Sequence, residues 1–245
     1  MEAISYDSQE TIQSDIRILS CADVSVTLAH SDEVGAVILD PWYNKGIGGS
    51  RPDYDDWLAG IIEASCRIAP HVFVWGFPEI VAPQVARIPQ GFKLRAWLTW
   101  YYKNCPSMIR GWRSAQNTCL HISAEGAKLY PEHFMNDAQL ERLRTGKMRF
   151  IPGPPTVFES PLNIGFVGKD EQTGHPAQKP KSVIEPLVLM STQENDTVLD
   201  PMCGSGTTGE VCLQLNRNAV LCDDSEEYLY ITQQRISAIK RIYGR

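Results

Sequence analysis

The apolar residues of this chain fall into short continuous runs, and between the runs they recur at the spacing of amphipathic helices. Residues 34–39 and 71–75 contain mostly apolar and β-branched side chains, which is typical of strands covered on both faces of a sheet. Residues 54–68 place apolar side chains three and four positions apart and predict a helix. Strands that alternate with helices in this way indicate an α/β fold.

The same alternation returns near the C-terminus after a less regular central part. Residues 94–102 and 118–123 are predicted to be two antiparallel strands joined by a long basic loop. Residues 129–174 interrupt the rhythm with repeated proline and glycine, so we expect an insert and not a separate folding domain. The other expected elements are strands at 16–19, 197–199 and 219–222 and helices at 77–88, 181–191, 207–215 and 226–243.

Composition limits the class of protein. With 245 residues, of which 43% are hydrophobic, the chain suits one large α/β domain that carries an insert. No run approaches the ~20 apolar residues of a membrane span, and residues 1–4 lack the basic and apolar regions of a signal peptide. The seven cysteines are scattered without metal-ligand spacing, so we expect reduced thiols in a cytoplasmic protein and no metal.

The net charge of −6 is unevenly distributed along the chain. Residues 87–149 contain eleven Lys and Arg and four acidic residues, which leaves a charge of −13 on the rest. This asymmetry is expected where one segment contacts phosphate groups and the rest does not. Chance clustering of solvated surface charges is the alternative that the charge count leaves open.

A glycine-rich turn, residues 200–206, joins a predicted strand to a predicted helix. Gly204 and Gly206 let the backbone approach a ligand where a Cβ atom would clash. Thr207 and Thr208 can cap the helix and reach ligand oxygens. The arrangement is that of a nucleotide-binding turn, which dinucleotide-binding folds share.

Two acids narrow the choice of ligand. Asp223, about 20 residues after the glycine turn, ends the next strand, where such folds bind the hydroxyls of a ribose. Asp200 starts the turn, where its carboxylate would repel a pyrophosphate but suit the ammonium of an amino-acid-bearing nucleoside. This favours S-adenosylmethionine over NAD. Simple helix capping by Asp200 and Thr207 is the alternative.

A second polar segment, Asp40-Pro41-Trp42-Tyr43, follows the strand at 34–39. The Asp40 carboxylate and the Pro41 carbonyl are acceptors that can hold the exocyclic amine of a base, whose lone pair is otherwise delocalised into the ring. Tyr43 can stack on a base turned out of a duplex. On its own, the tetrapeptide is equally compatible with an ordinary turn.

Together, the two segments resemble those of the amino-directed DNA methyltransferases, which methylate adenine N6 or cytosine N4. The family's catalytic tetrapeptide is Asp/Asn/Ser-Pro-Pro-Tyr/Phe/Trp, and its cofactor segment is similar to residues 200–208, with Phe more usual where Met202 stands. Residues 175–180, of sequence HPAQKP, are nearly the HPTQKP of one subgroup. The order, catalytic segment first and cofactor loop last, resembles the permuted β arrangement of these enzymes.

The resemblance implies an α/β, Rossmann-like S-adenosylmethionine-dependent methyltransferase fold, permuted, with a mixed seven-stranded sheet and helices on both faces. Residues 1–128 would form the catalytic half, residues 129–174 a variable target-recognition insert, and residues 175–245 the cofactor-binding half of the same domain. The strand at 16–19 would lie beside the strand that ends at Asp223.

The resemblance also implies roles for individual residues. Asp223 would bind the ribose of the cofactor, Gln178 and Lys179 its carboxylate end, and Asp23 is the carboxylate closest to the position expected to contact its adenine ring. The target base would be held by Asp40, Pro41, Trp42 and Tyr43. The other cofactor residues would be Asp200, Pro201, Met202, Gly204, Ser205, Gly206, Thr207, Thr208 and His175.

Two residues depart from the family's pattern. Trp42 stands in place of the second proline, and Met202 replaces an aromatic residue that packs near the methionine arm of the cofactor. Both replacements are apolar and Asp40 is retained, so we expect an active enzyme. DNA contacts are expected from the positive segment, at Lys103, Arg110, Trp112, Arg113, Arg142, Arg144, Lys147 and Arg149.

Aspartate at position 40 favours adenine N6, because cytosine-N4 members of the family more often have serine there. Cytosine N4 is the first alternative, an RNA or small-base substrate is a weaker one, and a non-catalytic nucleic-acid-binding paralogue belongs to a different class. Double-stranded DNA is the expected partner, with base flipping. A homodimer and a cognate restriction endonuclease are possible further partners, and a cytoplasmic, nucleoid-associated location without membrane contact is expected.

Overall fold

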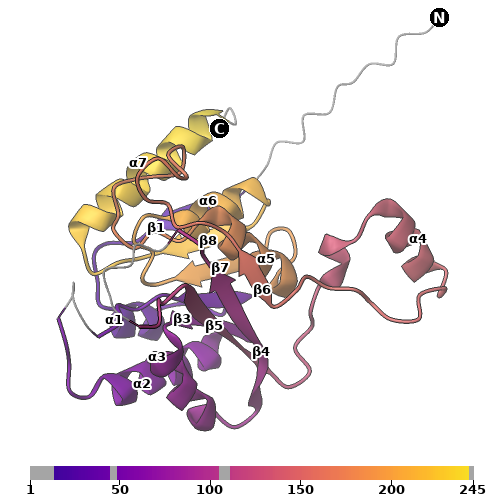
Figure 1. Ribbon diagram of the computed structural model, residues 1–245, viewed down its shortest axis with the longest axis horizontal. Helices are drawn as coiled ribbons and strands as arrows, with labels where there is room; N and C mark the ends of the chain where they lie inside the picture. The colour runs from indigo at the N-terminus through magenta and orange to yellow at the C-terminus, as the bar shows by residue number, and fades with distance from the viewer. Residues whose placement is uncertain (1–13, 45–48, 105–110, 243–245) are drawn as a thin grey trace, which may run out of the picture.

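The computed structural model describes residues 14–44, 49–104 and 111–242, and its centre is an eight-stranded sheet (Figure 1). The strands lie in the order β1-β8-β7-β2-β3-β5-β4-β6. In chain order they are β1 (Ile16–Ile18), β2 (Ala36–Leu39), β3 (His71–Gly76), β4 (Phe92–Tyr101), β5 (Gln116–Ala124), β6 (Val157–Glu159), β7 (Thr197–Asp200) and β8 (Asn218–Leu221).

The two halves of the chain meet in the middle of this sheet. β2 runs parallel to β7, with Val37 opposite Leu199. β1, β8, β7, β2 and β3 are mutually parallel, whereas β5 is antiparallel to both β3 and β4. The predicted neighbourhood of the first strand is confirmed, because β1 pairs with β8.

Helices cover both faces because successive strand residues point to opposite sides. On β2, Val37 and Leu39 belong to the buried cluster shared with α1 and α2, while Ala36 and Ile38 belong to the cluster shared with α5, α6 and α7. The helices are α1 (Val24–Ala29), α2 (Tyr54–Ile68), α3 (Pro78–Val81), α4 (Asp137–Arg144), α5 (Lys181–Ser191), α6 (Thr207–Gln214) and α7 (Glu226–Ile242), with 3-10 turns η1 (Ala82–Arg87) and η2 (Pro131–Phe134).

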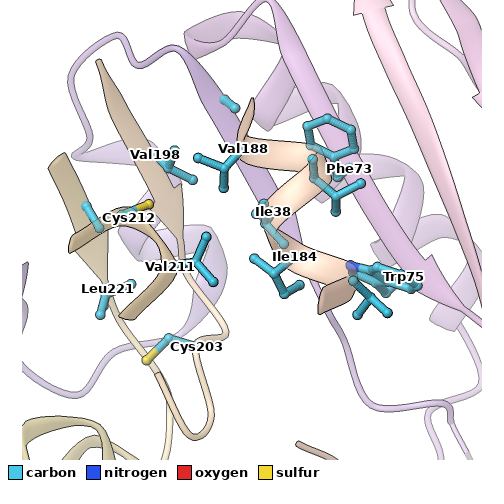
Figure 2. Packing of buried hydrophobic residues seen from close by; sticks show 14 of the residues in the cluster. Ile38, Phe73, Trp75, Ile184, Val188, Val198, Cys203, Val211, Cys212 and Leu221 are labelled. Carbon is cyan, nitrogen blue, oxygen red and sulfur yellow. The ribbon is translucent and has the colours of Figure 1, made fainter. Parts of the chain in front are cut away.

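Figure 2 shows the cluster on the α5 side of the sheet, where Ile184 and Val188 lie over Ile38, Phe73 and Trp75. Each of these five side chains is at most 2% exposed. Burial of one such side chain stabilises the fold by about 1.5–3 kcal/mol. α5 is therefore held firmly on the sheet, and residues 175–180, which precede α5, are held at the edge of the sheet.

The insert contains more regular structure than its composition indicated. β6 pairs in parallel with β4, so the sheet has eight strands and the prediction of seven is corrected. α4 lies apart from the sheet (Figure 1), none of its residues is buried, and a capping box of Asn136 and Gln139 closes its N-terminus. A three-residue strand and an exposed helix leave no apolar periodicity, which is why neither was predicted.

Other expectations were met closely or failed for local reasons. α2 and α5 have the predicted bounds. The helix expected over 77–88 divides into α3 and η1, because Pro83 has no N–H group to continue the α-helical bonding. α1 was not expected. No helix among the described residues is long and apolar enough to cross a bilayer.

A pair of buried histidines lies near the amino end of β3. His71 Nδ1 is 3.1 Å from His121 Nε2, and His71 Nε2 is 3.0 Å from the carbonyl oxygen of Lys128. His121 also stacks on Phe73. Burial, with the nearby His71 and Arg95, lowers the pKa of His121 to about 3, and burial lowers the pKa of His71. Both rings are therefore neutral in the folded protein at neutral pH.

This pair predicts a loss of stability in mild acid. The unfolded chain takes up a proton on each histidine near pH 6.5, whereas folded His121 stays neutral. The contribution of His121 to the free energy of unfolding is therefore full above about pH 6.5 and is lost as the pH falls toward 3. Between these two pH values, the free energy of unfolding is expected to fall by up to about 1.4 kcal/mol per pH unit for one such group. Urea unfolding at pH 7, 6 and 5 measures it.

His121→Phe should flatten this dependence while it keeps a ring against Phe73. The control His30→Gln changes an exposed histidine and should keep the wild-type slope. Identical slopes for wild type and His121→Phe would contradict the assignment.

Candidate active site

A cavity of about 510 Å³ opens at the carboxyl ends of β2, β7 and β8. Residues 40–43, 175–179 and 200–205 contribute to its lining, so three segments that are distant in sequence share one cavity. Of the residues predicted to bind the base or the cofactor, all except Gly206 line it. Ligands of open α/β sheets bind at this edge.

The glycine turn between β7 and α6 has the left-handed backbone that only glycine adopts without strain. Gly204 has φ 50° and Gly206 has φ 74°. A Cβ atom on Gly206 would lie 2.9 Å from the side chain of Thr232, and one on Gly204 would lie 3.0 Å from His175 Nε2. The Thr232 hydroxyl also donates a hydrogen bond to the Gly204 carbonyl at 2.9 Å. α7 thus holds the turn from behind.

Two buried acids flank this turn. Asp200 accepts a 2.5 Å hydrogen bond from the Thr208 hydroxyl, and Asp223 accepts one of 2.9 Å from the Gly204 N–H. Burial raises the pKa of Asp200 to about 7, with smaller contributions from Asp40 and Asp223, and burial also raises the pKa of Asp223. A positively charged ligand group would offset the free-energy cost of keeping these buried carboxylates charged, so the chemistry of the cavity suits a cation.

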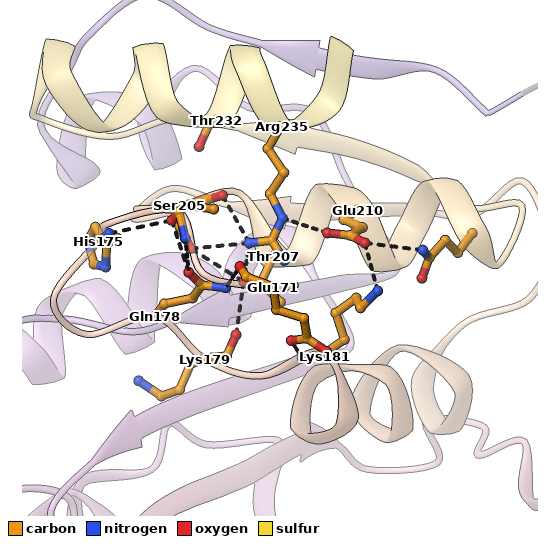
Figure 3. Close-up of polar contacts among 12 residues, drawn as sticks. Glu171, His175, Gln178, Lys179, Lys181, Ser205, Thr207, Glu210, Thr232 and Arg235 are labelled. Carbon is orange, nitrogen blue, oxygen red and sulfur yellow. Dashed lines mark hydrogen bonds and ion pairs between the residues drawn. The ribbon is translucent and has the colours of Figure 1, made fainter. Parts of the chain in front are cut away.

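A buried polar network supports the turn from the α7 side (Figure 3). Arg235 Nε pairs with Glu210 at 2.6 Å, and Arg235 Nη1 donates to Thr207 Oγ1 at 2.9 Å. Thr207 in turn donates to the Lys179 carbonyl at 3.0 Å, and Lys181 pairs with Glu210 at 2.8 Å. Neither Arg235 nor Glu210 was predicted, and their only sequence signal is a charge within the buried side of a helix.

The segment before α5 is held by its own side chains. Gln178 Oε1 accepts hydrogen bonds from the Thr173 N–H at 3.1 Å and hydroxyl at 2.9 Å, and Gln178 Nε2 donates to the Glu171 carbonyl. The His175 ring meets Tyr228 edge to face at 4.3 Å, and burial lowers its pKa. The Gln178 amide therefore fixes the loop that carries Lys179.

The catalytic candidate Asp40 is part of a polar cluster. Asp40 Oδ2 lies 2.5 Å from Lys179 Nζ, which also donates to the Tyr43 hydroxyl at 3.0 Å. Asn117 Nδ2 donates to the same hydroxyl at 2.7 Å, and the Tyr43 ring lies 4.6 Å from Phe77. Burial alone would lower the pKa of Lys179, but Asp40 and Tyr43 raise it above its ordinary value. Asn117 was not predicted.

Trp42, which replaces a proline, is held by neighbouring rings. It lies 5.4 Å from Tyr54 and 4.7 Å from Trp57, and the Tyr54 hydroxyl donates to its carbonyl oxygen. Met202, the second departure from the family's pattern, packs against the buried cluster shared with α1 and α2, as Trp42 does. Aromatic contacts thus hold the backbone at Trp42, where the resemblance implied a second proline.

Asp23 and the predicted DNA-contacting residues lie in different places. Asp23 lines the cavity and caps α1 through a 2.7 Å bond from the Ser25 N–H. Lys103 is exposed and paired with Glu159, and Arg110 lies outside the described residues. The remaining ones are exposed, with the last four on or just after α4: Trp112, Arg113, Arg142, Arg144, Lys147 and Arg149. No metal-binding group of His, Cys, Asp or Glu occurs in the described part of the chain.

The fold and this site define an S-adenosylmethionine-dependent DNA methyltransferase, which acts on adenine N6 or cytosine N4. The chain belongs to the DNA methylase family of N6 and N4 methyltransferases, whose model matches residues 34–234. The sequence interpretation of the family, the fold and the cofactor is confirmed.

Individual relatives agree with this membership. Type II methyltransferase M.HpaI of Haemophilus parainfluenzae is 26% identical over 241 residues, which cover 90% of this chain and 74% of that protein. DNA adenine methyltransferase YhdJ of Escherichia coli (strain K12) is 24% identical over 228 residues, 84% of this chain and 77% of YhdJ. Two other type II methyltransferases, both 30% identical, are covered over 62% of their own length.

A solved structure has the same fold. The complex of M1.HpyAVI with S-adenosylmethionine superposes with a TM-score of 0.68 at 22% identity and covers 90% of this chain and 98% of that one. The residues of the present cavity fit this cofactor. Gly204 brings backbone without a Cβ atom to the cavity wall, and the buried acids Asp200 and Asp223 suit its ammonium and its ribose hydroxyls.

The shape of the glycine turn predicts a specific sensitivity. Gly206→Ala is expected to weaken S-adenosylmethionine binding at least tenfold, because the new methyl group must displace Thr232 and the left-handed backbone becomes strained. Isothermal titration calorimetry measures this. Gly91→Ala is the matched control, since Gly91 has φ 84° with open space around its Cβ position. Gly91→Ala should strain the backbone in the same way but bind S-adenosylmethionine like wild type. Equal affinities of wild type, Gly206→Ala and Gly91→Ala for S-adenosylmethionine would refute the prediction.

Proposed function

We propose that the protein methylates the N6 amine of adenine in a short DNA sequence, on a base turned out of the duplex. The observation that carries this proposal is the position of Asp40, which shares one cavity with the glycine turn. A carboxylate at this place can hold a neutral amine next to the cofactor. Base flipping is part of the proposal because the amine of a paired base is inaccessible inside a duplex.

The residues around Asp40 supply acceptors for the target amine. Asp40 Oδ1 and the Pro41 carbonyl would accept its two N–H groups. Oδ1 is the oxygen that is not paired with Lys179, and it accepts a long 3.5 Å hydrogen bond from the Tyr43 hydroxyl. Acceptors on both hydrogens favour a tetrahedral nitrogen with a localised lone pair. Tyr43 would stack on the base, and Asp40 would accept the proton that the methylated amine releases. S-adenosylmethionine, when bound, supplies the electrophilic methyl group.

The cofactor would be held by residues of the other two segments. Asp200 would accept from its ammonium, Asp223 would bind its ribose hydroxyls, and Asp23 would contact its adenine ring. His175, which also lines the cavity, would contact the cofactor as well. The remaining contacts would come from the turn, at Pro201, Met202, Gly204, Ser205, Thr207 and Thr208, whereas Gly206 would act through the shape of the turn.

Adenine is preferred to cytosine because residue 40 is aspartate, and the 24% identical relative YhdJ is named as a DNA adenine methyltransferase. Cytosine N4 remains the alternative, since the family contains both activities. A non-catalytic paralogue is less favoured, because Asp40 and the glycine turn are both retained.

We further propose that DNA is bound by the positive segment, with the exposed α4 arm, residues 137–149, contacting phosphate groups. Its exposed Arg142, Arg144, Lys147 and Arg149 support this. A matching restriction endonuclease is a further proposal that rests on the type II relatives. A homodimer stays a prediction from the resemblance alone.

Removal of the Asp40 carboxylate tests the catalytic assignment. Asp40→Ala is expected to lower the transfer of labelled methyl groups to unmethylated DNA by at least about 100-fold, because the target amine loses its main acceptor. Mass spectrometry of the hydrolysed DNA should identify N6-methyldeoxyadenosine as the wild-type product. The control Asp32→Asn alters an exposed aspartate and should leave transfer unchanged.

The outcomes separate the alternatives. If the product is N4-methyldeoxycytidine, the target base is cytosine and not adenine. Full transfer by Asp40→Ala would refute the role of Asp40, and the absence of transfer by the wild-type protein would favour the non-catalytic paralogue.

The proposed phosphate contacts predict a strong dependence on salt. Replacing the four basic residues of the α4 arm by Gln should weaken DNA binding and lower the slope of log K against log salt by up to about one unit for each basic side chain that binds a phosphate. Fluorescence anisotropy between 50 and 200 mM salt measures the slope. The control Arg67→Gln/Arg241→Gln removes two exposed charges elsewhere and should keep it. An unchanged slope in the arm variant would exclude the arm from the interface.

A further inference from the structure

The ion pair between Lys179 and Asp40 joins the segment before α5 to the catalytic segment after β2. Lys179 Nζ lies 2.5 Å from Asp40 Oδ2, and the two side chains are 6% and 22% exposed. Family resemblance assigned Lys179 to the carboxylate end of the cofactor. In this structure its ammonium instead contacts residues that would hold the target base.

The surroundings of the ammonium leave it little freedom. Lys179 Nζ also donates to the Tyr43 hydroxyl, and it lies 5.5 Å from the ring centre of Trp75 and 5.7 Å from that of Tyr43. Aromatic faces attract a cation but do not solvate it as water does. A buried ammonium therefore requires a nearby anion, and Asp40 supplies that anion.

The backbone of Lys179 is fixed as well as its side chain. Its carbonyl accepts the hydrogen bond from Thr207, the first residue of α6, at 3.0 Å. Thr207 is itself bound by the buried Arg235. Main chain and side chain together make Lys179 a bridge between the glycine turn and the catalytic carboxylate.

The carboxylates of the cavity differ in how their charge is balanced. Asp40 is paired with the Lys179 ammonium. Asp200 and Asp223 accept hydrogen bonds from a hydroxyl and from backbone N–H groups, and within the described residues neither has an ion-pair partner. The uncompensated charges of Asp200 and Asp223 therefore favour a cationic ligand near them, whereas the compensated charge of Asp40 suits a neutral hydrogen-bond donor.

We propose that Lys179 is a positioning residue for Asp40. Its ammonium holds Oδ2 and balances the carboxylate charge. Oδ1 accepts one long hydrogen bond, of 3.5 Å, from the Tyr43 hydroxyl and keeps a lone pair that can accept from a neutral target amine. The inference rests on the methyl transfer at Asp40 proposed above. It adds a residue outside the catalytic tetrapeptide to the machinery that selects and orients the amine.

Substitutions of Lys179 test this role. Lys179→Met should lower kcat at saturating S-adenosylmethionine at least tenfold, while the dissociation constant of S-adenosylmethionine, measured by calorimetry, changes less than threefold. Lys179→Arg keeps a cation beside Asp40 and should remain within tenfold of wild type. Lys179→Gln keeps a donor without the charge and should fall below Lys179→Arg. Lys169→Met, a change of an exposed lysine, is the control.

A kcat of Lys179→Met within tenfold of wild type would overturn the proposal. So would a tenfold loss of S-adenosylmethionine affinity with kcat retained, since Lys179 would then serve the cofactor. Calorimetric stoichiometry reports whether each variant is folded. If Lys179→Met is not folded, the comparison of Gln with Arg decides, and equal kcat values of these two variants would refute the role of the charge. A wild-type protein without methyl transfer would refute the proposed function and not this role alone.

Discussion

The parallel pairing of β2 with β7 is the constraint on which the site depends. Their register, with Val37 opposite Leu199, brings the carboxyl ends of two distant segments to the same edge of the sheet. Asp40 and Asp200 consequently line one cavity, although about 160 residues separate them. The helices on both faces keep this pair of strands in place. Chemistry can therefore reside in loops, because the sheet under them supplies the geometry.

The features that could be predicted are those that leave a local signature. α2 and α5 were placed at their observed bounds because each buries one regularly spaced face, and the glycine turn was found because its residues are adjacent. The ion pair of Lys179 with Asp40 could not be found in this way, since its partners are 139 positions apart. Arg235 could not be predicted either, because the sequence shows a charge on the inner side of a helix but not that Glu210 lies beside it. α4 and β6 were missed because they bury too little.

The departures from the family's motifs have a common physical explanation. A proline restricts a loop through its own covalent ring, whereas Trp42 is restricted by its contacts with Tyr54 and Trp57. Met202 packs against the buried cluster that contains Tyr54, as Trp42 does, and a methionine side chain is flexible enough to fill an irregular gap. Rigidity next to Asp40 is thus retained, but its source moves from the backbone to the packing around it.

The exposed position of α4 also affects how the sequence can change between lineages. None of the residues of this helix is buried, and its N-terminus is closed by a capping box within the segment itself. A surface substitution there leaves the core intact and changes folding free energy by only about 0.5 kcal/mol or less. Purifying selection for stability therefore acts weakly on this segment and strongly on the sheet. Divergence between descendants of this protein is expected to accumulate first at those positions of the arm that have no proposed contact with phosphate.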